Sequence, residues 1–170
     1  ANTEDEAQAL IDKVMSYKPK NSWFMSYLLL GTDPFSDEDN VPEGEYLKNY
    51  IYSNFIWNNF TVVKLYETSG NLTVSNTFNE IEGGYGLINF AGHGDQLSWN
   101  LGTGERYTYS HASSQSNSNL SIIFAMACLT SRFKDYDCIG EHFLLNPSGG
   151  AIAYLGASRV TWAYSGADVV

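Results

Sequence analysis

Five short apolar runs are spaced along the chain, and most of them carry apolar residues at both odd and even positions. They occupy residues 24–31, 60–67, 85–91, 121–128 and 151–157. In a strand with one solvent-exposed face, apolar and polar residues would alternate with a period of two, whereas SIIFAMAC and AIAYLGA are apolar almost throughout. This pattern is typical of strands covered on both faces, so the sequence predicts a largely parallel sheet.

Segments with helical periodicity separate most of these strands. Thr3 and Glu6 form a capping box before an apolar stripe that Pro19 closes. Further helices are predicted over residues 42–55, 74–81 and 139–145, the first with Leu47, Tyr50, Ile51 and Phe55 on roughly one face. Strands alternating with helices imply right-handed βαβ units and an α/β fold. Residues 95–119 are polar and rich in Ser, Gly and Asn, and are predicted to be mostly loop.

The chain of 170 residues is long enough for one domain with a sizeable core. No run approaches 18 consecutive apolar residues, so no membrane span is expected. The sequence does not begin with Met, which suggests a trimmed or mature piece. Residues 158–170 hold no evident covering helix, so we expect a further C-terminal chain or segment to complete the sheet.

Charge and cysteine content narrow the partners and the compartment. There are 9 basic and 19 acidic residues, a net charge of −10, and phosphate binding needs a basic surface, so nucleic acid is not an expected partner. Two cysteines are too few for a disulfide scaffold. Low lysine content, acidity and the sequons at Asn59, Asn71 and Asn119 favour an extracytoplasmic or secreted protein.

Two of the apolar runs end in residues that carry chemistry. One run stops at Gly92-His93-Gly94, and another stops at Ala127-Cys128. The carboxyl ends of strands form the edge where open α/β sheets bind ligands, so the two side chains would emerge side by side if the strands are neighbours. An imidazole can activate a thiol, and the N–H groups of Gly94 and Cys128 can stabilise an oxyanion.

Plainer interpretations of the same residues stay open. The glycines can simply make a tight turn, and a buried cysteine is usually inert. A zinc site built from Cys128, Cys138, His93 and His142 is a weak alternative, since only Cys138 and His142 have ligand-like spacing. A disulfide between Cys128 and Cys138 would mask the thiol. Nucleotide-binding glycine loops and the Gly-x-Ser-x-Gly elbow are absent.

Longer stretches resemble the gingipain family of caspase-like (clan CD) cysteine peptidases, peptidase family C25. The stretch LINFAGHGDQLSW is similar to the histidine-bearing strand of that family, and SIIFAMACLTSRF to its nucleophile strand. The segment CIGEHFLLNPSGGAIAYLGASRVTW follows in the same order, and the resemblance spans about residues 13–162. It implies a caspase-like three-layer αβα sandwich around a mostly parallel sheet.

The resemblance also implies roles for three residues. Cys128 would be the nucleophile, and His93 the general base and acid. Asp33, in GTDPF, stands where the family has a carboxylate that orients the histidine. Such a carboxylate would fix the tautomer of the ring and stabilise the imidazolium. The alternative for Asp33 is a turn cap before Pro34.

Two further positions match the substrate pocket of the arginine-specific members of the family. Glu43, with Glu45 as its neighbour, falls where these members hold an acid for a basic P1 residue. Trp162 stands where the family has an aromatic wall of that pocket. The alternatives are dipole pairing at a helix start for the acids and core packing for the tryptophan.

The sequence therefore predicts a cysteine endopeptidase that acts on peptides or proteins, with a preference for basic P1 residues. The alternative is an inactive caspase-like module with a binding, adhesion or assembly role. No cofactor is expected, and calcium binding is left unassigned. Family members continue beyond the last strand and carry a preceding subdomain. Residues 1–170 are therefore interpreted as an incomplete catalytic core or one chain of a processed enzyme.

Overall fold

The computed structural model describes residues 2–19, 23–35 and 41–161. The helices are α1 (Glu4–Ser16), α2 (Glu43–Phe55), α3 (Val74–Gly83), α4 (Tyr109–Ser113) and α5 (Ile139–Leu145). The strands are β1 (Ser26–Gly31), β2 (Thr61–Tyr66), β3 (Leu87–Ala91), β4 (Ser98–Asn100), β5 (Arg106–Thr108), β6 (Ser121–Met126) and β7 (Ala151–Gly156).

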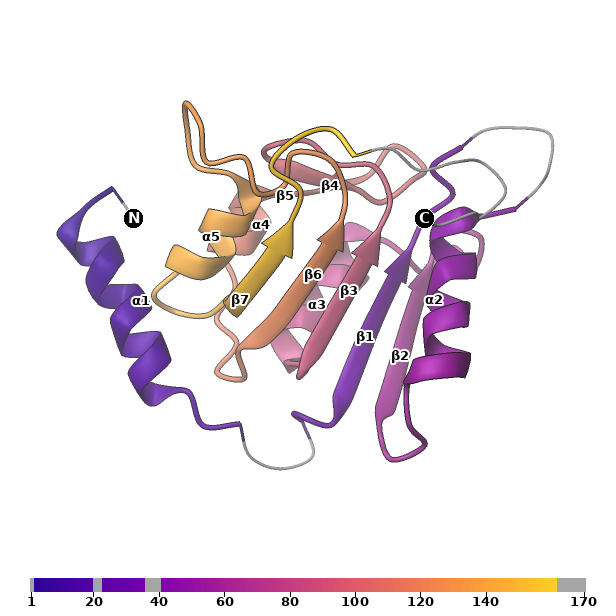
Figure 1. The fold of residues 1–170 in the computed structure, drawn as a ribbon, viewed down its shortest axis with the longest axis horizontal. Coiled ribbons are helices and arrows are strands. Elements are labelled where there is room, and N and C mark those ends of the chain that lie inside the picture. The colour runs from indigo at the N-terminus through magenta and orange to yellow at the C-terminus, as the bar shows by residue number, and fades with distance from the viewer. Residues whose placement is uncertain (1, 20–22, 36–40, 162–170) are drawn as a thin grey trace.

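The main sheet contains the five strands predicted from the apolar runs, in the order β2-β1-β3-β6-β7 (Figure 1). Every pair in this sheet is parallel, which confirms the prediction from the apolar patterning. All carboxyl ends therefore lie along one edge of the sheet. Strands β3 and β6, which lead to the two candidate catalytic residues, are direct neighbours.

Helices lie on both faces of the sheet and make three layers. Alternate residues of β1 face opposite layers, so Leu28 and Leu30 join the main core while Leu29 lies on the side of α2. The main core packs α3, α4 and α5 against the sheet. Leu28, Leu30, Ile88, Phe90 and Ile123 are at most 1% exposed there.

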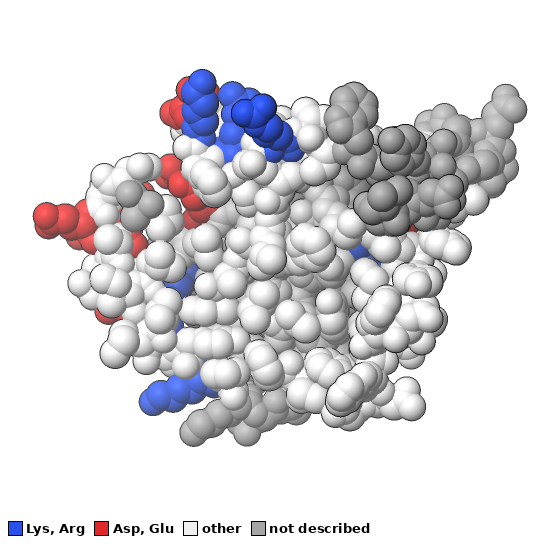
Figure 2. Space-filling model, in the orientation of Figure 1, with Lys and Arg blue, Asp and Glu red and all other residues white. Residues whose placement is uncertain are grey.

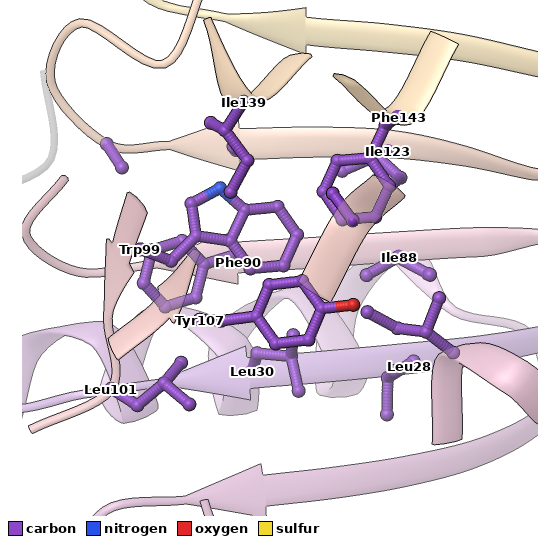
Figure 3. Packing of buried hydrophobic residues seen from close by; sticks show 14 of the residues in the cluster. Leu28, Leu30, Ile88, Phe90, Trp99, Leu101, Tyr107, Ile123, Ile139 and Phe143 are labelled. Atoms are coloured by element: carbon purple, nitrogen blue, oxygen red, sulfur yellow. The ribbon is translucent and has the colours of Figure 1, made fainter. Parts of the chain in front are cut away.

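The polar region after β3 is more ordered than its composition predicts. Most of residues 95–119 are loop, as predicted, but the prediction missed the antiparallel hairpin β4–β5 and the short helix α4. The reason is a few well-placed large side chains rather than overall polarity. Trp99 and Tyr107 are fully buried, and Trp99 stacks on Phe90 at 5.0 Å and on Phe143 at 5.3 Å between ring centroids. Figure 3 shows these rings packed over the sheet.

Two helices use different faces from those expected. The capping box at the start of α1 is present, but the buried residue of α1 is Lys13, whose Nζ donates to the carbonyls at the end of α5. In α2, Tyr50 and Phe55 are 51% and 66% exposed, so the predicted apolar face is wrong at these positions. Lys48 is the fully buried side chain instead, and its ammonium donates to the amide oxygen of Asn89.

The sheet face on the side of α2 is covered only in part by the described residues. Phe124 of β6 and Leu155 of β7 are 44% and 54% exposed there, so the prediction of strands covered on both faces holds for β1 and β3 but not for these two. Figure 2 shows that this part of the surface carries almost no charge. None of the described helices is long and apolar enough to cross a lipid bilayer.

Candidate active site

His93 follows β3 after one glycine and is exposed at the carboxyl edge of the sheet. Its Nε2 atom lies 2.7 Å from the carbonyl oxygen of Pro34, in the turn after β1. A carbonyl oxygen only accepts hydrogen bonds, so Nε2 carries the proton in this contact and Nδ1 is left as the basic nitrogen. Phe35 packs edge-on against the ring at 6.3 Å between centroids. The imidazole is thus held from two sides.

Cys128 follows β6 after one alanine, and its thiol is free and half-buried. Its Sγ atom accepts the backbone N–H of Thr161 at 3.4 Å and lies 3.5 Å from the Thr161 hydroxyl. The chain after β7 runs beside the Cys128 loop, because Leu129 N–H donates to the carbonyl of Arg159 at 3.2 Å. Thr161 is exposed, so the thiol lies near the surface beneath this segment.

The register of the sheet brings the two residues to the same level. Ala91 of β3 is paired with Met126 of β6, and His93 and Cys128 each lie two residues beyond this pair. Pairing continues past the strand ends, since Gly92 N–H donates to the carbonyl of Met126 at 3.3 Å. The prediction that neighbouring strands place His93 and Cys128 at one edge is confirmed.

Gly94 packs directly on the cysteine loop. A Cβ atom at Gly94 would lie 2.8 Å from the Cβ of Ala127, 2.9 Å from the Cγ2 of Thr130 and 3.1 Å from the carbonyl oxygen of Cys128. These separations are below ordinary van der Waals contact, so only glycine allows the histidine and cysteine loops to lie this close. The glycine after His93 is therefore required by packing.

The backbone N–H groups of Gly94 and Cys128 are the predicted oxyanion donors. In the antiparallel hairpin after His93, the hydrogen bonds across the hairpin use the carbonyl of His93 and the N–H of Asp95. Gly94 lies between them, opposite Trp99, in a pair that is not hydrogen-bonded, so its N–H faces away from Trp99. Within residues 2–19, 23–35 and 41–161, neither Gly94 N–H nor Cys128 N–H has a hydrogen-bond acceptor. This arrangement is compatible with the predicted oxyanion donors.

Asp33 is exposed in the turn after β1, and its backbone N–H donates to the carboxylate of Glu67 at 2.9 Å. In the part of the chain that the structure describes, the acceptor on His93 Nε2 is the carbonyl of Pro34 rather than the carboxylate of Asp33. The orienting role of Asp33 therefore stays a prediction. The hydrogen bond to the imidazole that was expected of its carboxylate is made by the carbonyl of the next residue, Pro34.

The two acids at the start of α2 are both buried, with Glu43 6% and Glu45 4% exposed. Glu45 accepts the backbone N–H of Thr68 at 2.8 Å and the hydroxyl of Thr68 at 2.6 Å, so its carboxylate has a structural role. The start of α2 is tied to the end of β1, because Gly44 N–H donates to the carbonyl of Thr32 at 3.0 Å. Glu43 consequently lies at the same sheet edge as His93.

Trp162, the residue expected to form an aromatic wall of the substrate pocket, lies outside the described residues. Cys128 and Cys138 are both free, so the disulfide is not formed. Cys138 is fully buried, and burial raises the pKa of its thiol to about 11. No group of three or more His, Cys, Asp or Glu side chains able to hold a metal occurs in the described ranges, which counts against the zinc alternative.

An open cleft of about 480 Å³ adjoins the cysteine loop on the side of the β4–β5 hairpin. The loop after Cys128 forms one wall of the cleft. Gln96 holds this loop in place, since it is 6% exposed and its Nε2 lies 2.7–2.8 Å from three carbonyl oxygens of the loop. Leu129, Tyr109, Tyr136 and Arg132 line it. Figure 2 shows Lys and Arg gathered over the loops at this end of the molecule.

Sequence reasoning missed three groups near the site. The Pro34 carbonyl and the Thr161 backbone carry no side-chain signal, because any residue supplies these atoms. Glu67 was available to sequence reasoning as an acid at the carboxyl end of a predicted strand, where ligand-binding edges form. Its significance lies in its contacts, which only the tertiary structure reveals.

Comparisons with known proteins give one family and one fold. The family model described as peptidase family C25 matches residues 1–169. A sequence comparison with the curated proteins finds no relative. A structure titled "Structure of Protease" matches with a TM-score of 0.78 and 20% identity, over 95% of this chain and 36% of that chain.

Two further matches concern Porphyromonas gingivalis RgpB and gingipain R (RGPB). The complex of the RgpB pro- and mature domains has a TM-score of 0.72 and 20% identity, over 96% of this chain and 40% of that one. The Arg-specific cysteine proteinase gingipain R has a TM-score of 0.68 and 20% identity, over 91% and 37%. This chain thus spans well under half the length of the solved chains, and the likeness confirms the predicted caspase-like α/β fold.

Proposed function

The chain belongs to peptidase family C25, and from this premise we propose that it is the core of a cysteine endopeptidase that uses Cys128 and His93. The observation that carries the proposal is the matched position of the two residues. Each lies two residues beyond the paired ends of adjacent parallel strands, and Gly94 brings their loops into contact. Nothing in simple packing requires an exposed histidine and a half-buried free thiol at the same point.

The chemistry follows from the surroundings of each group. Cys128 gives its proton to Nδ1 of His93, the nitrogen that does not contact Pro34, and its sulfur attacks the peptide carbonyl carbon. The N–H groups of Gly94 and Cys128 would stabilise the resulting oxyanion. His93 then protonates the leaving amine as the C–N bond breaks, which leaves a thioester on Cys128.

Hydrolysis of the thioester restores the enzyme. Water gives a proton to His93 while its oxygen attacks the thioester carbonyl, and the C–S bond breaks to release the carboxylic acid. His93 returns its proton to the sulfur. The hydrogen bond from Nε2 to the Pro34 carbonyl keeps the ring in one tautomer and stabilises the imidazolium at both stages. Asp33, the carboxylate expected from the family pattern, is proposed only as a second contributor to this orientation.

The primary test compares the parent protein with Cys128→Ala on peptides that carry Arg or Lys at P1. We expect cleavage by the parent and none by the variant, and equal cleavage by both would contradict the mechanism. Stoichiometric labelling of Cys128 by iodoacetamide at pH 6 separates the peptidase from an inactive binding or assembly module, because an ordinary thiol reacts slowly there. Cys138 serves as the internal control, since burial raises the pKa of its thiol to about 11.

A preference for basic P1 residues is the finer part of the proposal. One matched solved structure is described as an Arg-specific proteinase, and Glu43 lies at the sheet edge that carries His93. We expect Glu43→Gln to reduce selectivity for Arg and Lys over uncharged P1 residues. Glu45→Gln is the matched control, because the carboxylate of Glu45 is engaged by Thr68. Unchanged selectivity in Glu43→Gln would count against this pocket.

The location of the enzyme and the segment that completes it are proposed from composition and from the exposed apolar surface. An acidic chain with 19 Asp and Glu and three sequons is compatible with an extracytoplasmic or secreted peptidase that acts on protein substrates. The exposed apolar side chains of β6 and β7 support a further segment that completes the domain over this face. No residue is assigned to calcium.

A further inference from the structure

The carboxylate of Glu67 connects two loops at the carboxyl edge of the sheet. Its Oε2 accepts the backbone N–H of Asp33 at 2.9 Å, and its Oε1 accepts the backbone N–H of Thr103 at 3.3 Å. Asp33 immediately precedes Pro34, whose carbonyl accepts the hydrogen bond of His93 Nε2. The carboxylate is therefore one residue away from the group that orients the imidazole.

The backbone around Glu67 is fixed before its side chain is considered. Its N–H donates to the carbonyl of Gly31 at 3.2 Å, which continues the pairing of β2 with β1 past the end of both strands. The next residue, Thr68, gives its N–H and its hydroxyl to the buried carboxylate of Glu45. A side chain that starts from a backbone held on both sides can position a neighbouring loop.

The hairpin turn between β4 and β5 packs against the same carboxylate. Gly102 has a φ of 78°, and a Cβ atom there would lie 2.0 Å from the Cδ of Glu67. Thr103 and Gly104 also have positive φ values, of 49° and 85°. This left-handed turn needs glycine on steric grounds, and its Thr103 N–H is aimed at Glu67.

We propose that Glu67 is a positioning residue for the reaction, which holds the turn at Asp33 and Pro34 so that the Pro34 carbonyl stays on His93. It acts through the backbone and does not touch the reacting atoms. The same carboxylate links the β4–β5 turn to the turn at Asp33 and Pro34, because it also accepts the N–H of Thr103. The inference rests on the proposed peptidase function, in which His93 must present Nδ1 to the thiol.

The kinetic test uses Glu67→Ala, Glu67→Gln and the control Glu82→Ala. Glu82 of α3 also accepts a loop N–H, that of Ser116 at 2.6 Å, but it precedes β3 and lies at the opposite edge of the sheet from His93. We expect Glu67→Ala to lower kcat about tenfold to a hundredfold with KM within about threefold, because small misplacement of a catalytic group costs rate rather than binding. Glu67→Gln keeps one acceptor oxygen and its volume, so it should fold and retain more of kcat than Glu67→Ala.

A second readout does not depend on catalysis. Nitrogen NMR of the ring distinguishes the two tautomers, and a His93→Asn variant identifies His93 among the 3 histidines. The parent should show His93 with its proton on Nε2, and Glu67→Ala should shift it towards a mixture. His111 is the internal reference, since its Nδ1 accepts the N–H of Thr108 at 2.9 Å and none of the substituted residues takes part in this contact.

The outcomes separate this inference from the proposed function. Folded Glu67 variants that keep both the parent tautomer of His93 and the parent kcat would overturn it. A parent that cleaves no peptide would contradict the proposed function, whereas a tautomer shift in Glu67→Ala would still support the positioning role. A tautomer shift that appears equally in Glu82→Ala would reduce the effect to general destabilisation and contradict the proposal.

Discussion

The Nε2 atom of His93 lies 2.7 Å from the carbonyl oxygen of Pro34, and this contact gives the imidazole one preferred tautomer. The acceptor comes from the turn after β1, and the histidine follows β3, the strand paired with β1. Parallel pairing therefore delivers both partners to the same edge. A backbone carbonyl cannot be removed by mutating its own side chain, so the relationship has to be tested through its neighbours.

Asp33→Asn tests whether the side chain at this turn is needed. The substitution removes the charge but keeps the backbone N–H that Glu67 accepts. If the Pro34 carbonyl is sufficient to orient His93, kcat/KM on a P1-Arg peptide should stay within about threefold of the parent. Loss of an essential orienting carboxylate costs on the order of ten-thousand-fold in serine peptidases. A loss of more than about a hundredfold would assign the orienting role to Asp33.

Gly94→Ala tests the contact between the histidine and cysteine loops. The new methyl group would lie 2.8 Å from Ala127 Cβ and 3.1 Å from the carbonyl oxygen of Cys128, so one loop must shift. We expect about 1–3 kcal/mol of destabilisation from overpacking and a fall in kcat of at least about tenfold. Chemical unfolding and peptide cleavage measure the two effects.

Gly83→Ala is the control for the Gly94 experiment. A Cβ atom at Gly83 has nothing within 4 Å, and the residue belongs to α3. Alanine is favoured over glycine in a helix by about 0.5–1 kcal/mol, so the control should be neutral or slightly stabilising. Equal losses of activity in both variants would argue against a specific role for Gly94.

Lys48 predicts a dependence of stability on pH. Burial lowers the pKa of its ammonium from 10.5 to about 7. Between these values the unfolded chain binds the proton and the folded chain does not, so stability rises with pH across this window. Below about pH 7 both states are protonated and the contribution is constant.

Lys48→Met should remove this pH-dependent gain. We expect the stability of the variant relative to the parent to be greatest near pH 7 and to fall towards pH 10, as measured by urea unfolding at several pH values. Parent and variant curves that run parallel across this range would contradict the buried position of Lys48.

Lys13 is expected to hold α1 on α5. Its Nζ lies 2.8 Å from the carbonyl oxygen of Leu144 and 3.1 Å from that of Phe143, at the end of α5. Lys13→Met would leave these carbonyls without their charged donor, at a cost of about 1–3 kcal/mol. Hydrogen exchange should become faster across α1, whereas the exposed control Lys18→Met should leave it unchanged.

The strands were predictable because each carries its own signal. Runs such as SIIFAM are apolar at every position after the first, and a segment of that kind is typical of a strand in a parallel sheet. The hairpin β4–β5 was not predictable from composition, because its burial depends on Trp99 meeting Phe90 and Phe143 from other elements. The burial of Lys48 likewise depends on Asn89 across the layer.

The sequence by itself determined the succession along the chain of the five main-sheet strands and of α1, α2, α3 and α5, the family, and the placement of His93 and Cys128 at strand ends. These are local properties, because hydrophobic periodicity and glycine positions are written along the chain. Only the tertiary structure decided that the Pro34 carbonyl contacts His93, that Glu67 supports that turn, and that Glu45 is engaged by Thr68. Backbone atoms look the same in every residue, so their partners are set by sheet register and loop packing rather than by residue type.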